Sequence, residues 1–429
     1  MKKVVLLLLS GAFALSPVPV AQSAPSGWSA PELIPAPDIG VLTPPPVFDA
    51  RGDAFLAWTE RKLTVKESIT LEYPVRTSMR PVDGSWQAPE TLSHLGAYPG
   101  VAVDAGGDEI AVWQGFSGIQ ATTRAAGGGW LAPQMVARSS ADPKVASDAS
   151  GDAIIVAQRI RSMRSTGIRA VLRLSGEDTF SPAQAVSAPG NDFEQRIAIN
   201  ARGDAVVAWE REPAHGCIVE AAFRPANGSW SRPRALADAH AGCQLWEYQE
   251  VAIDDHGDSV VTWLTSRGRT GFIESASRGA NGRWTARRIL AKGRMAGTVD
   301  LGMDARGDAI VVWDEWALNS HEGSAMWMRI RPAGHAWGPA QQIPGAKNGT
   351  PSLAIDPRGD ALIAWWSKRG IEAAARPAGG RWQKPYTLSE HERIHDGRVL
   401  AALDARGDAI VTWQNHDGIV TAWNSALFP

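Results

Sequence analysis

The sequence predicts an all-β fold: a single eight-bladed β-propeller of four-stranded antiparallel blades, closed by an N-terminal strand that completes the last blade. Three observations predict it. A pattern of Asp-x-x-Gly-Asp-Ala, a short apolar run and a tryptophan recurs eight times with small variations. Its spacing, from Asp49 to Asp404, averages about 51 residues, a period that indicates a solenoid, a propeller or an array. Each unit also holds four short runs of β-forming residues separated by turn signals.

The second unit illustrates the four expected strands. Residues 100–104 form a short apolar run, and the sequence Ala-Gly-Gly-Asp after Asp104 is a turn signal. Residues 109–113 are a second run of β-formers, and residues 118–124 alternate as a third. Three glycines then precede the fourth segment, residues 130–136. Four strands in a unit of this length are typical of a propeller blade.

Proline sets the expected order of strands within a blade. The fourth segment carries Trp-x-x-Pro in most units, as in Trp130 with Pro133. Because proline cannot donate to a β-ladder, this segment is predicted to be the outermost strand. The run before the Asp-x-x-Gly-Asp turn is then the innermost strand. It carries small residues where the blades crowd at the axis: Ala102, Ala146, Ala198, Ala252, Gly302, Ala354 and Ala402.

The two ends of the chain predict closure of the ring. The repeat opens with an outermost-type strand at residues 27–33. It finishes with three inner-type strands at residues 399–403, 409–413 and 419–423. The first strand therefore has a place in the last blade, where it removes an open edge that would invite aggregation.

These turns resemble the repeats of NHL-type propellers, in which an Asp-x-x-Gly turn joins the two inner strands. They are also similar to the Asp-box of sialidase-like propellers and to the tryptophan-docking repeat of quinoprotein propellers. The resemblance implies architecture. A sialidase-like mechanism would further need a tyrosine with an acid partner, and Tyr248 beside Glu247 and Glu250 is the plausible pair. A quinoprotein would need adjacent cysteines, which this sequence lacks.

The first 23 residues are expected to be a signal peptide. Lys2 and Lys3 precede an apolar run at residues 4–15, and Ala21-Gln22-Ser23 offers a small-x-small cleavage site. The propeller is then expected over residues 24–429 of a secreted or periplasmic protein. In such a compartment Cys217 and Cys243 are expected to form a disulfide, with two free buried thiols as the alternative.

The bulk composition excludes some classes of partner. The chain has 43 basic and 45 acidic residues, so no electrostatic footprint for nucleic acid is present. The apolar leader is too short to span a bilayer comfortably, so no membrane span is expected. We expect no cofactor, and we expect a monomer.

The repeated residues are expected to be structural. The turn glycines supply positive φ, and the turn aspartates bond nearby backbone amides. Arg-Gly-Asp occurs five times, but it is the commonest version of this turn rather than an adhesion motif. The turns lack a full set of spaced oxygen ligands for calcium. The repeated tryptophans are expected to pack between blades.

The candidate site lies on the face opposite these turns, because its loops differ in every unit and function concentrates on variable loops. Tryptophans outside the repeat occur in or beside these loops, together with acids and histidines. Such groups suit sugars or peptides. The candidate ligand-binding residues are Trp246, Tyr248, Glu250, Glu315, Trp316, Trp366, His391 and His395, with the three tryptophans as anchors over blades five to eight. The alternative is that these tryptophans only plug loops.

His391 and His395 could also belong to a metal site, but their loop placement and chance spacing argue against one. The sequence therefore favours a non-catalytic binding or scaffold protein for a glycan or an extracytoplasmic protein. The alternative is a carbohydrate-active enzyme, a sialidase-like hydrolase or a lyase, with its site at the mouth of the central channel.

Overall fold

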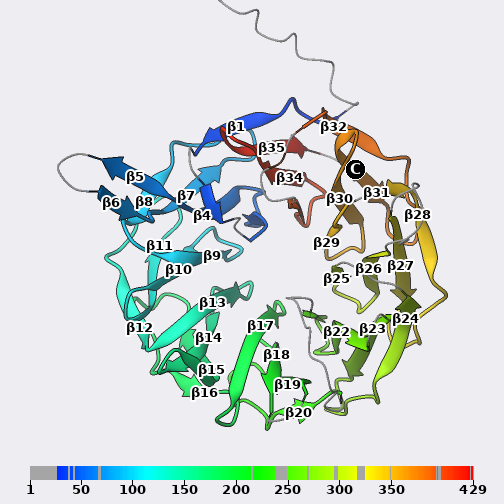
Figure 1. Ribbon diagram of the computed structural model, residues 1–429, viewed down its shortest axis with the longest axis horizontal. Coiled ribbons are helices and arrows are strands. Elements are labelled where there is room, and N and C mark those ends of the chain that lie inside the picture. The colour runs from blue at the N-terminus through cyan, green and yellow to red at the C-terminus, as the bar shows by residue number, and fades with distance from the viewer. Residues whose placement is uncertain are drawn as a thin grey trace, which may run out of the picture.

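A computed structural model describes residues 27–36, 39–41, 44–65, 69–213, 216–237, 249–267, 270–293, 298–315, 324–347, 349–392, 394, 398–425 and 427–428. The described residues contain strands and no helix. Eight antiparallel blades form one closed ring around a central axis (Figure 1). The predicted eight-bladed propeller is therefore confirmed.

Each blade runs from an inner strand to an outer strand. The innermost strands are β3 (Val47–Phe48), β9 (Ala97–Val103), β13 (Ser140–Ser147), β17 (Asn191–Ile199), β21 (Gln249–Ile253), β25 (Val299–Met303), β29 (Ser352–Ile355) and β33 (Val399–Leu403). The second strands are β4 (Ala54–Glu60), β10 (Glu109–Gly115), β14 (Ala153–Arg161), β18 (Ala205–Glu212), β22 (Ser259–Arg267), β26 (Ala309–Glu315), β30 (Ala361–Ser367) and β34 (Ala409–Gln414).

The third strands are β7 (Val75–Arg80), β11 (Gly118–Arg124), β15 (Arg164–Arg173), β19 (Ile218–Arg224), β23 (Thr270–Arg278), β27 (Ala325–Arg331), β31 (Gly370–Arg376) and β35 (Gly418–Asn424). The outermost strands are β8 (Glu90–Ser93), β12 (Gln134–Arg138), β16 (Gln184–Ala185), β20 (Arg234–Ala235), β24 (Arg288–Gly293), β28 (Gln341–Lys347), β32 (Tyr386–Glu390) and β1 (Glu32–Pro35).

The first strand closes the ring as predicted. β1 pairs antiparallel with β35 in the last blade, with Glu32 opposite Thr421. Blade 1 also contacts this joint between β1 and β35, because the indole N–H of Trp86 donates to the Thr421 hydroxyl at 2.9 Å. The backbone N–H of Trp86 donates to the Glu32 carboxylate at 3.1 Å. The joint is therefore held by three segments that are far apart in the sequence.

Two details differ from the prediction. The outermost strands begin after the proline rather than at the tryptophan: β12 starts at Gln134, directly after Pro133. The tryptophan segment is tied to the third strand through the residue after Trp130, since the N–H of Leu131 donates to Thr123 at 2.9 Å. Blade 1 also has two additions. A short strand β2 (Ile39–Val41) pairs with β4, and a hairpin of β5 (Lys62–Val65) and β6 (Ile69–Glu72) projects from it.

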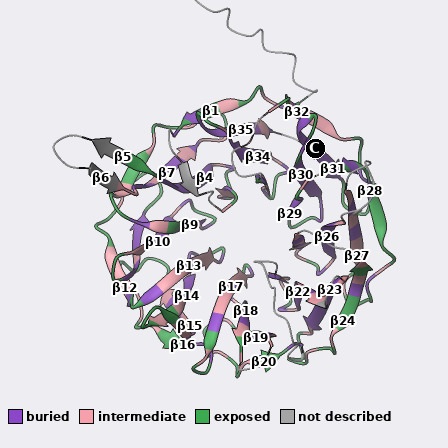
Figure 2. Ribbon diagram, viewed as in Figure 1, coloured by how far each residue is buried: buried purple, intermediate pink, exposed green. Residues whose placement is uncertain are grey.

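The hydrophobic core lies between neighbouring blades, because its buried clusters combine residues of two adjacent blades. Figure 2 shows the buried residues along the strands. In blade 6, Trp313 packs against Val260 and Ile273 of blade 5. Blade 3 has Ala157 where the tryptophan would stand. The second-strand tryptophans are at most 2 % exposed, which confirms their predicted packing: Trp58, Trp113, Trp209, Trp263, Trp313, Trp365 and Trp413.

Candidate functional site

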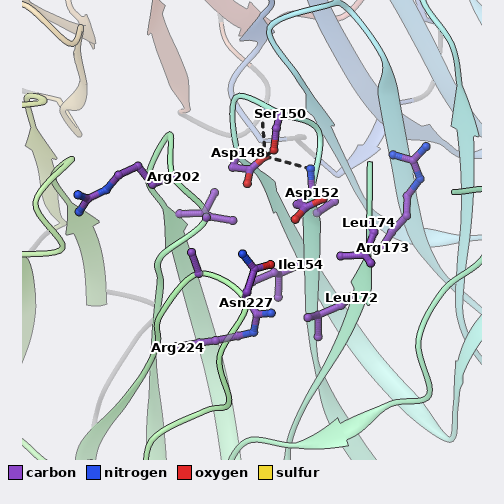
Figure 3. A pocket seen from close by; sticks show the side chains of 14 residues that line it. Asp148, Ser150, Asp152, Ile154, Leu172, Arg173, Leu174, Arg202, Arg224 and Asn227 are labelled. Carbon is purple, nitrogen blue, oxygen red and sulfur yellow. Dashed lines mark hydrogen bonds between the residues drawn. The ribbon is translucent and has the colours of Figure 1, made fainter. Parts of the chain in front are cut away.

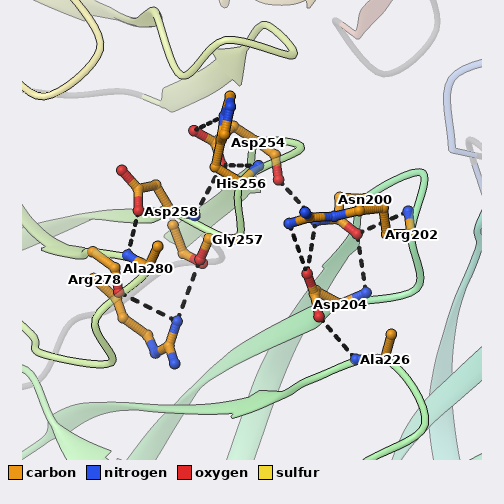
Figure 4. Close-up of polar contacts among 12 residues, drawn as sticks. Asn200, Arg202, Asp204, Ala226, Asp254, His256, Gly257, Asp258, Arg278 and Ala280 are labelled. Carbon is orange, nitrogen blue, oxygen red and sulfur yellow. Dashed lines mark hydrogen bonds and ion pairs between the residues drawn. The ribbon is translucent and has the colours of Figure 1, made fainter.

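The face that carries the Asp-x-x-Gly-Asp turns is held by hydrogen bonds within the repeat. In blade 5, Oδ1 of Asp254 accepts the backbone N–H groups of His256 and Asp258, both at 2.8 Å (Figure 4). Asp258 in turn accepts the N–H of Ala280, in the turn before the outer strand. The side-chain amide of Asn200, in blade 4, donates to the carbonyl of Asp254 at 2.9 Å. The two aspartates therefore connect neighbouring turns through hydrogen bonds, which is the structural role predicted for them.

The turn glycine is required by conformation and by space. Gly307 has a φ of +98°, in the left-handed region. A Cβ added there would lie 2.5 Å from Oδ2 of Asp254 in the preceding blade. Glycine at this position thus lets one blade approach the next.

A shallow pocket between blades 3 and 4 opens on this same face (Figure 3). In blade 6 the turn arginine covers the equivalent space, because Nη2 of Arg306 donates to the carbonyl of Arg358 in blade 7 at 2.8 Å. Blade 3 has Ser150 instead, and its hydroxyl donates to its own turn aspartate, Asp148, at 2.8 Å. The pocket is therefore the gap left by a missing arginine. Its lining includes Asp148, Ser150, Asp152, Arg173, Arg202 and Arg224.

Charged side chains gather on the inner strands, toward the opposite, variable face. Lys144, Arg196, Glu250 and Asp300 occupy one repeat position, four residues before the first turn residue, in four successive blades. The other four blades have uncharged residues there: Pro45, Gly100, Ser352 and Leu400. The repeat does not require charge at this position, so the four residues form a specific feature. We call them the axial cluster.

One ion pair within the axial cluster crosses a blade boundary, whereas Lys144 pairs within its own strand. Nε of Arg196 lies 3.6 Å from Oε1 of Glu250, and the two side chains are 24 % and 29 % exposed. Nζ of Lys144 lies 2.5 Å from Oδ1 of Asp142, with the lysine 32 % exposed. These axial side chains are therefore partly open to solvent.

Asp300 is the anchored member of the cluster. Its Oδ1 accepts the N–H of Leu301, and its Oδ2 accepts the N–H of Leu353 in the next blade, both at 2.7 Å. Ser352 makes the equivalent link one blade further on, where its hydroxyl accepts the N–H of Ala401 at 3.1 Å. Asp300 therefore fastens blade 6 to blade 7 in addition to carrying charge.

Burial and mutual repulsion change the acidity of the two carboxyl groups. Burial, followed by the charge of Glu250, raises the pKa of Asp300 to about 7, against the opposing effect of its two amide hydrogen bonds. Burial also raises the pKa of Glu250, although the charges of Arg196 and Lys144 oppose the shift. Such a coupled pair can give up or take a proton close to neutral pH.

The inner strands of blades 2, 3 and 4 bulge beside the cluster. Tyr98, Asp142 and Glu194 each lie six residues before the first turn residue and have φ values of +49°, +49° and +53°. The ladder register shifts at each of these places. The side-chain amides of Gln195 and Gln249 hold two of the bulges by donating to the carbonyls of Asp142 and Glu194 in the preceding blade. Bulges and left-handed non-glycine residues concentrate at functional sites.

The structure describes half of the residues that the sequence selected. Glu250 belongs to the axial cluster. Glu315 ends β26 and packs against Gly293 of blade 5. A Cβ added at Gly293 would lie 2.5 Å from Oε1 of Glu315. The remaining predictions concern Trp246, Tyr248, Trp316 and His395, which lie outside the described residues and stay predictions.

Trp366 and His391 lie together at the rim of blade 7. The Trp366 side chain is 37 % exposed, and its indole N–H donates to the carbonyl of Glu392 at 3.1 Å. His391 is exposed, and its backbone N–H donates to Arg369 at 2.8 Å. No contact among the described residues joins this rim to Glu250 on the inner strand of blade 5. The predicted site as a whole stays a prediction, because four of its eight residues lie outside the described part of the chain.

Lys144, Arg196 and Asp300 are not among the predicted site residues. They lie within the repeat, whereas the prediction rested on residues of the variable loops. A comparison of the same position in all eight units would have found them, because four units carry charge there and four do not.

Cys217 is buried and disulfide-bonded. Its proposed partner, Cys243, lies outside the described residues, so that pairing stays a prediction. Within the described part of the chain, no three histidine, cysteine or carboxylate side chains are grouped to hold a metal ion. The same residues include no helix that is long and apolar enough to cross a membrane.

Comparison with known proteins finds distant structural likeness and no sequence relative. No protein-family model and no curated protein sequence matches the chain, so none of the repeat families named above is shown. The polysaccharide lyase Uly1 is similar in structure, with a TM-score of 0.47 and 10 % identity over 74 % of this chain and 88 % of its own. The α-L-arabinofuranosidase Arb93A of Fusarium graminearum gives 0.41 and 10 %, over 66 % and 92 %. A eukaryotic initiation factor gives 0.47 and 8 %, over 82 % and 80 %. Likeness at this level leaves ligand and reaction open.

Proposed function

We propose that the protein is a carbohydrate-active enzyme, a hydrolase or lyase that binds a glycan across the variable mouth of its central channel. The observation that carries this proposal is the axial cluster. Two cations and two carboxyl groups occupy one repeat position in four successive blades, where the other blades have no charge, and Arg196 and Glu250 among them lie 3.6 Å apart. Carbohydrate cleavage needs groups that move a proton and groups that bind oxygen atoms, and the cluster contains both kinds.

The two carboxyl groups of the axial cluster are held by different contacts, and this difference indicates different roles. Asp300 is fixed by two backbone amides, whereas Glu250 is held by the longer ion pair with Arg196. Glu250 is therefore the carboxyl group best placed to exchange a proton with a ligand, and Asp300 acts on it through charge. Arg196 and Lys144 would bind hydroxyl or carboxylate oxygens of the glycan. The leader sequence supports placing this activity outside the cytoplasm, and we expect the protein to act as a monomer.

A second candidate is a binding protein without catalysis, which the sequence favoured. The exposed ring of Trp366 supports it, because an aromatic surface fixed through its N–H suits stacking on a sugar or contact with a protein segment. Both candidates use the same variable face, so they differ in whether Glu250 transfers a proton.

The test is a panel of polysaccharides incubated with the exported protein. New reducing ends would report hydrolysis, and ultraviolet absorbance of an unsaturated product would report a lyase. We expect Glu250→Gln to lower the rate by about 100-fold or more, the usual contribution of general acid–base catalysis, and to leave glycan affinity within a few-fold.

The matched control is Ser352→Ala, which changes the same repeat position two blades away and should retain activity. An active Glu250→Gln variant would refute the assigned site. Binding without cleavage across the whole panel would instead favour the non-catalytic candidate.

A further inference from the structure

We propose that the protein docks on an anionic lipid surface through the hairpin tips of blades 2 and 3. Phe116 lies between β10 and β11, and Met163 lies between β14 and β15. These two strand pairs belong to adjacent blades (Figure 1). This inference is independent of the glycan site, because it rests on other residues.

Both tips present apolar side chains to water. Phe116 and Met163 are each 96 % exposed, and they lie at the same end of neighbouring blades. Leu95 and Tyr98, at the inner edge of blade 2, are also about half exposed. Single exposed apolar residues are common, but two fully exposed tips side by side indicate a surface that is covered in function.

The blade 3 turn keeps its methionine at a conformational cost. Arg161 pairs with Arg164, which leaves Ser162 and Met163 as a two-residue turn with φ values of +50° and +62°. Turns with positive φ at both central residues favour Asn-Gly, because bulky side chains are strained there. The conformation of the turn does not require a methionine, so the exposed Met163 side chain indicates an interaction with a partner outside the protein.

Arginines surround the Met163 tip without compensating acids. Residues 153–173 contain five arginines and neither aspartate nor glutamate. Arg161 and Arg164 are directly opposed across the hairpin, an arrangement that is destabilising for like charges. Arg169 lies further along the same hairpin, where burial, followed by the charge of Arg159, lowers its pKa. Among the described residues, no ion pair joins Arg159, Arg161 or Arg164 to a carboxylate.

An anionic bilayer fits this combination. Peripheral segments bury apolar side chains about 5–10 Å into the headgroup boundary. At about 3.3 Å per strand residue, Arg161 and Arg164, which are two residues and one residue from Met163, lie within this depth of the tip. Arginine binds phosphate through two N–H groups at once. A flexible lipid surface also needs no pocket, whereas a protein or glycan partner would require shape complementarity.

The test is co-sedimentation of the protein with vesicles of phosphatidylglycerol mixed with phosphatidylcholine, and with vesicles of phosphatidylcholine alone. We expect binding to the anionic vesicles and its loss at high salt. Replacement of both Arg161 and Arg164 by serine should weaken binding about 25-fold, or roughly fivefold for each arginine near the surface. The control is Arg306→Ser with Arg358→Ser on the opposite face, which removes the same charge and should leave binding unchanged.

A second variant separates folding from docking. Ser162→Asn with Met163→Gly supplies the preferred turn, so it should melt at the same or a higher temperature and yet bind vesicles about tenfold less tightly. The proposal is overturned if the wild-type protein ignores anionic vesicles or if the tip variants bind like wild type. It is also overturned if polygalacturonate binds to the tips while vesicles do not, since the patch would then recognise acidic polysaccharide. Glycan cleavage should be unaffected in every tip variant.

Discussion

Individual carboxyl groups near the axis carry protons at pH values where carboxylates are usually ionised. Glu210, in β18, is 3 % exposed. Burial, together with the neighbouring Glu194 and Glu212, raises its pKa to about 8. The folded protein therefore retains a proton that the unfolded chain releases near pH 4.5. Stability from this group is complete below that value and is lost as the pH rises through about 8.

This single residue gives a measurable pH dependence of stability. The melting temperature of the wild-type protein should fall between acidic pH and pH values above the raised pKa. Glu210→Gln cannot ionise, so its melting temperature should fall by about 2–5 °C less over the same range. The measurement is calorimetry of both proteins across the pH series. Parallel curves for the two proteins would mean that Glu210 does not titrate as described.

In seven of the eight blades, a tryptophan of the second strand is buried in the core between blades. Trp313 fills the space between blades 5 and 6, so its loss leaves a cavity in a rigid interface. Trp366 is also on a second strand, but it lies at the end of that strand and is 37 % exposed. Two tryptophans of equal size thus occupy different environments within the same kind of element.

Alanine substitutions at these two positions should separate packing from binding. We expect Trp313→Ala to destabilise the protein by about 3–5 kcal/mol, because the lost contacts add to the cost of the cavity. Trp366→Ala should change stability little and should weaken glycan affinity if the rim takes part in binding. Urea unfolding gives the first quantity and glycan titration the second. Equal destabilisation by both variants would place Trp366 in the core.

Sequence reasoning succeeded for features that every blade repeats. The Asp254 type of turn, the buried tryptophans and the closing strand follow from spacing and from the chemistry of glycine, aspartate and proline. It failed where a residue's role depends on neighbouring blades. Arg196 and Glu250 are 54 positions apart, and only the ring brings them to 3.6 Å. Phe116 falls between the expected strands at residues 109–113 and 118–124, but nothing in a single unit reveals that its side chain and that of Met163 are exposed at neighbouring tips.

The whole ring depends on a contact between the two ends of the repeat. β1 supplies the fourth strand of the last blade, and Ile34 within it is 1 % exposed against Trp58 of blade 1. Without β1, the edge of β35 would be open to pairing with another chain. Residues 27–36 should therefore be essential for a closed monomer.

Deletion of residues 27–36 tests this dependence. We expect the shortened protein to melt at a markedly lower temperature and to associate through its open edge, as measured by light scattering after gel filtration. A synthetic peptide of the deleted residues should restore the monomer and raise the melting temperature. A shortened protein that stays monomeric and equally stable would show that closure does not need β1.

The pairing of β1 with β35 also sets the order in which the ring can form. A chain that is made or exported from its N-terminus presents β1 first, and its partner β35 last. Thr421, opposite Glu32, must arrive before the ladder can form. Until β35 is present, β1 has no strand to pair with, and a chain that stops earlier cannot close the ring. Ring closure therefore requires the last blade, so only a chain that includes it can form the closed propeller.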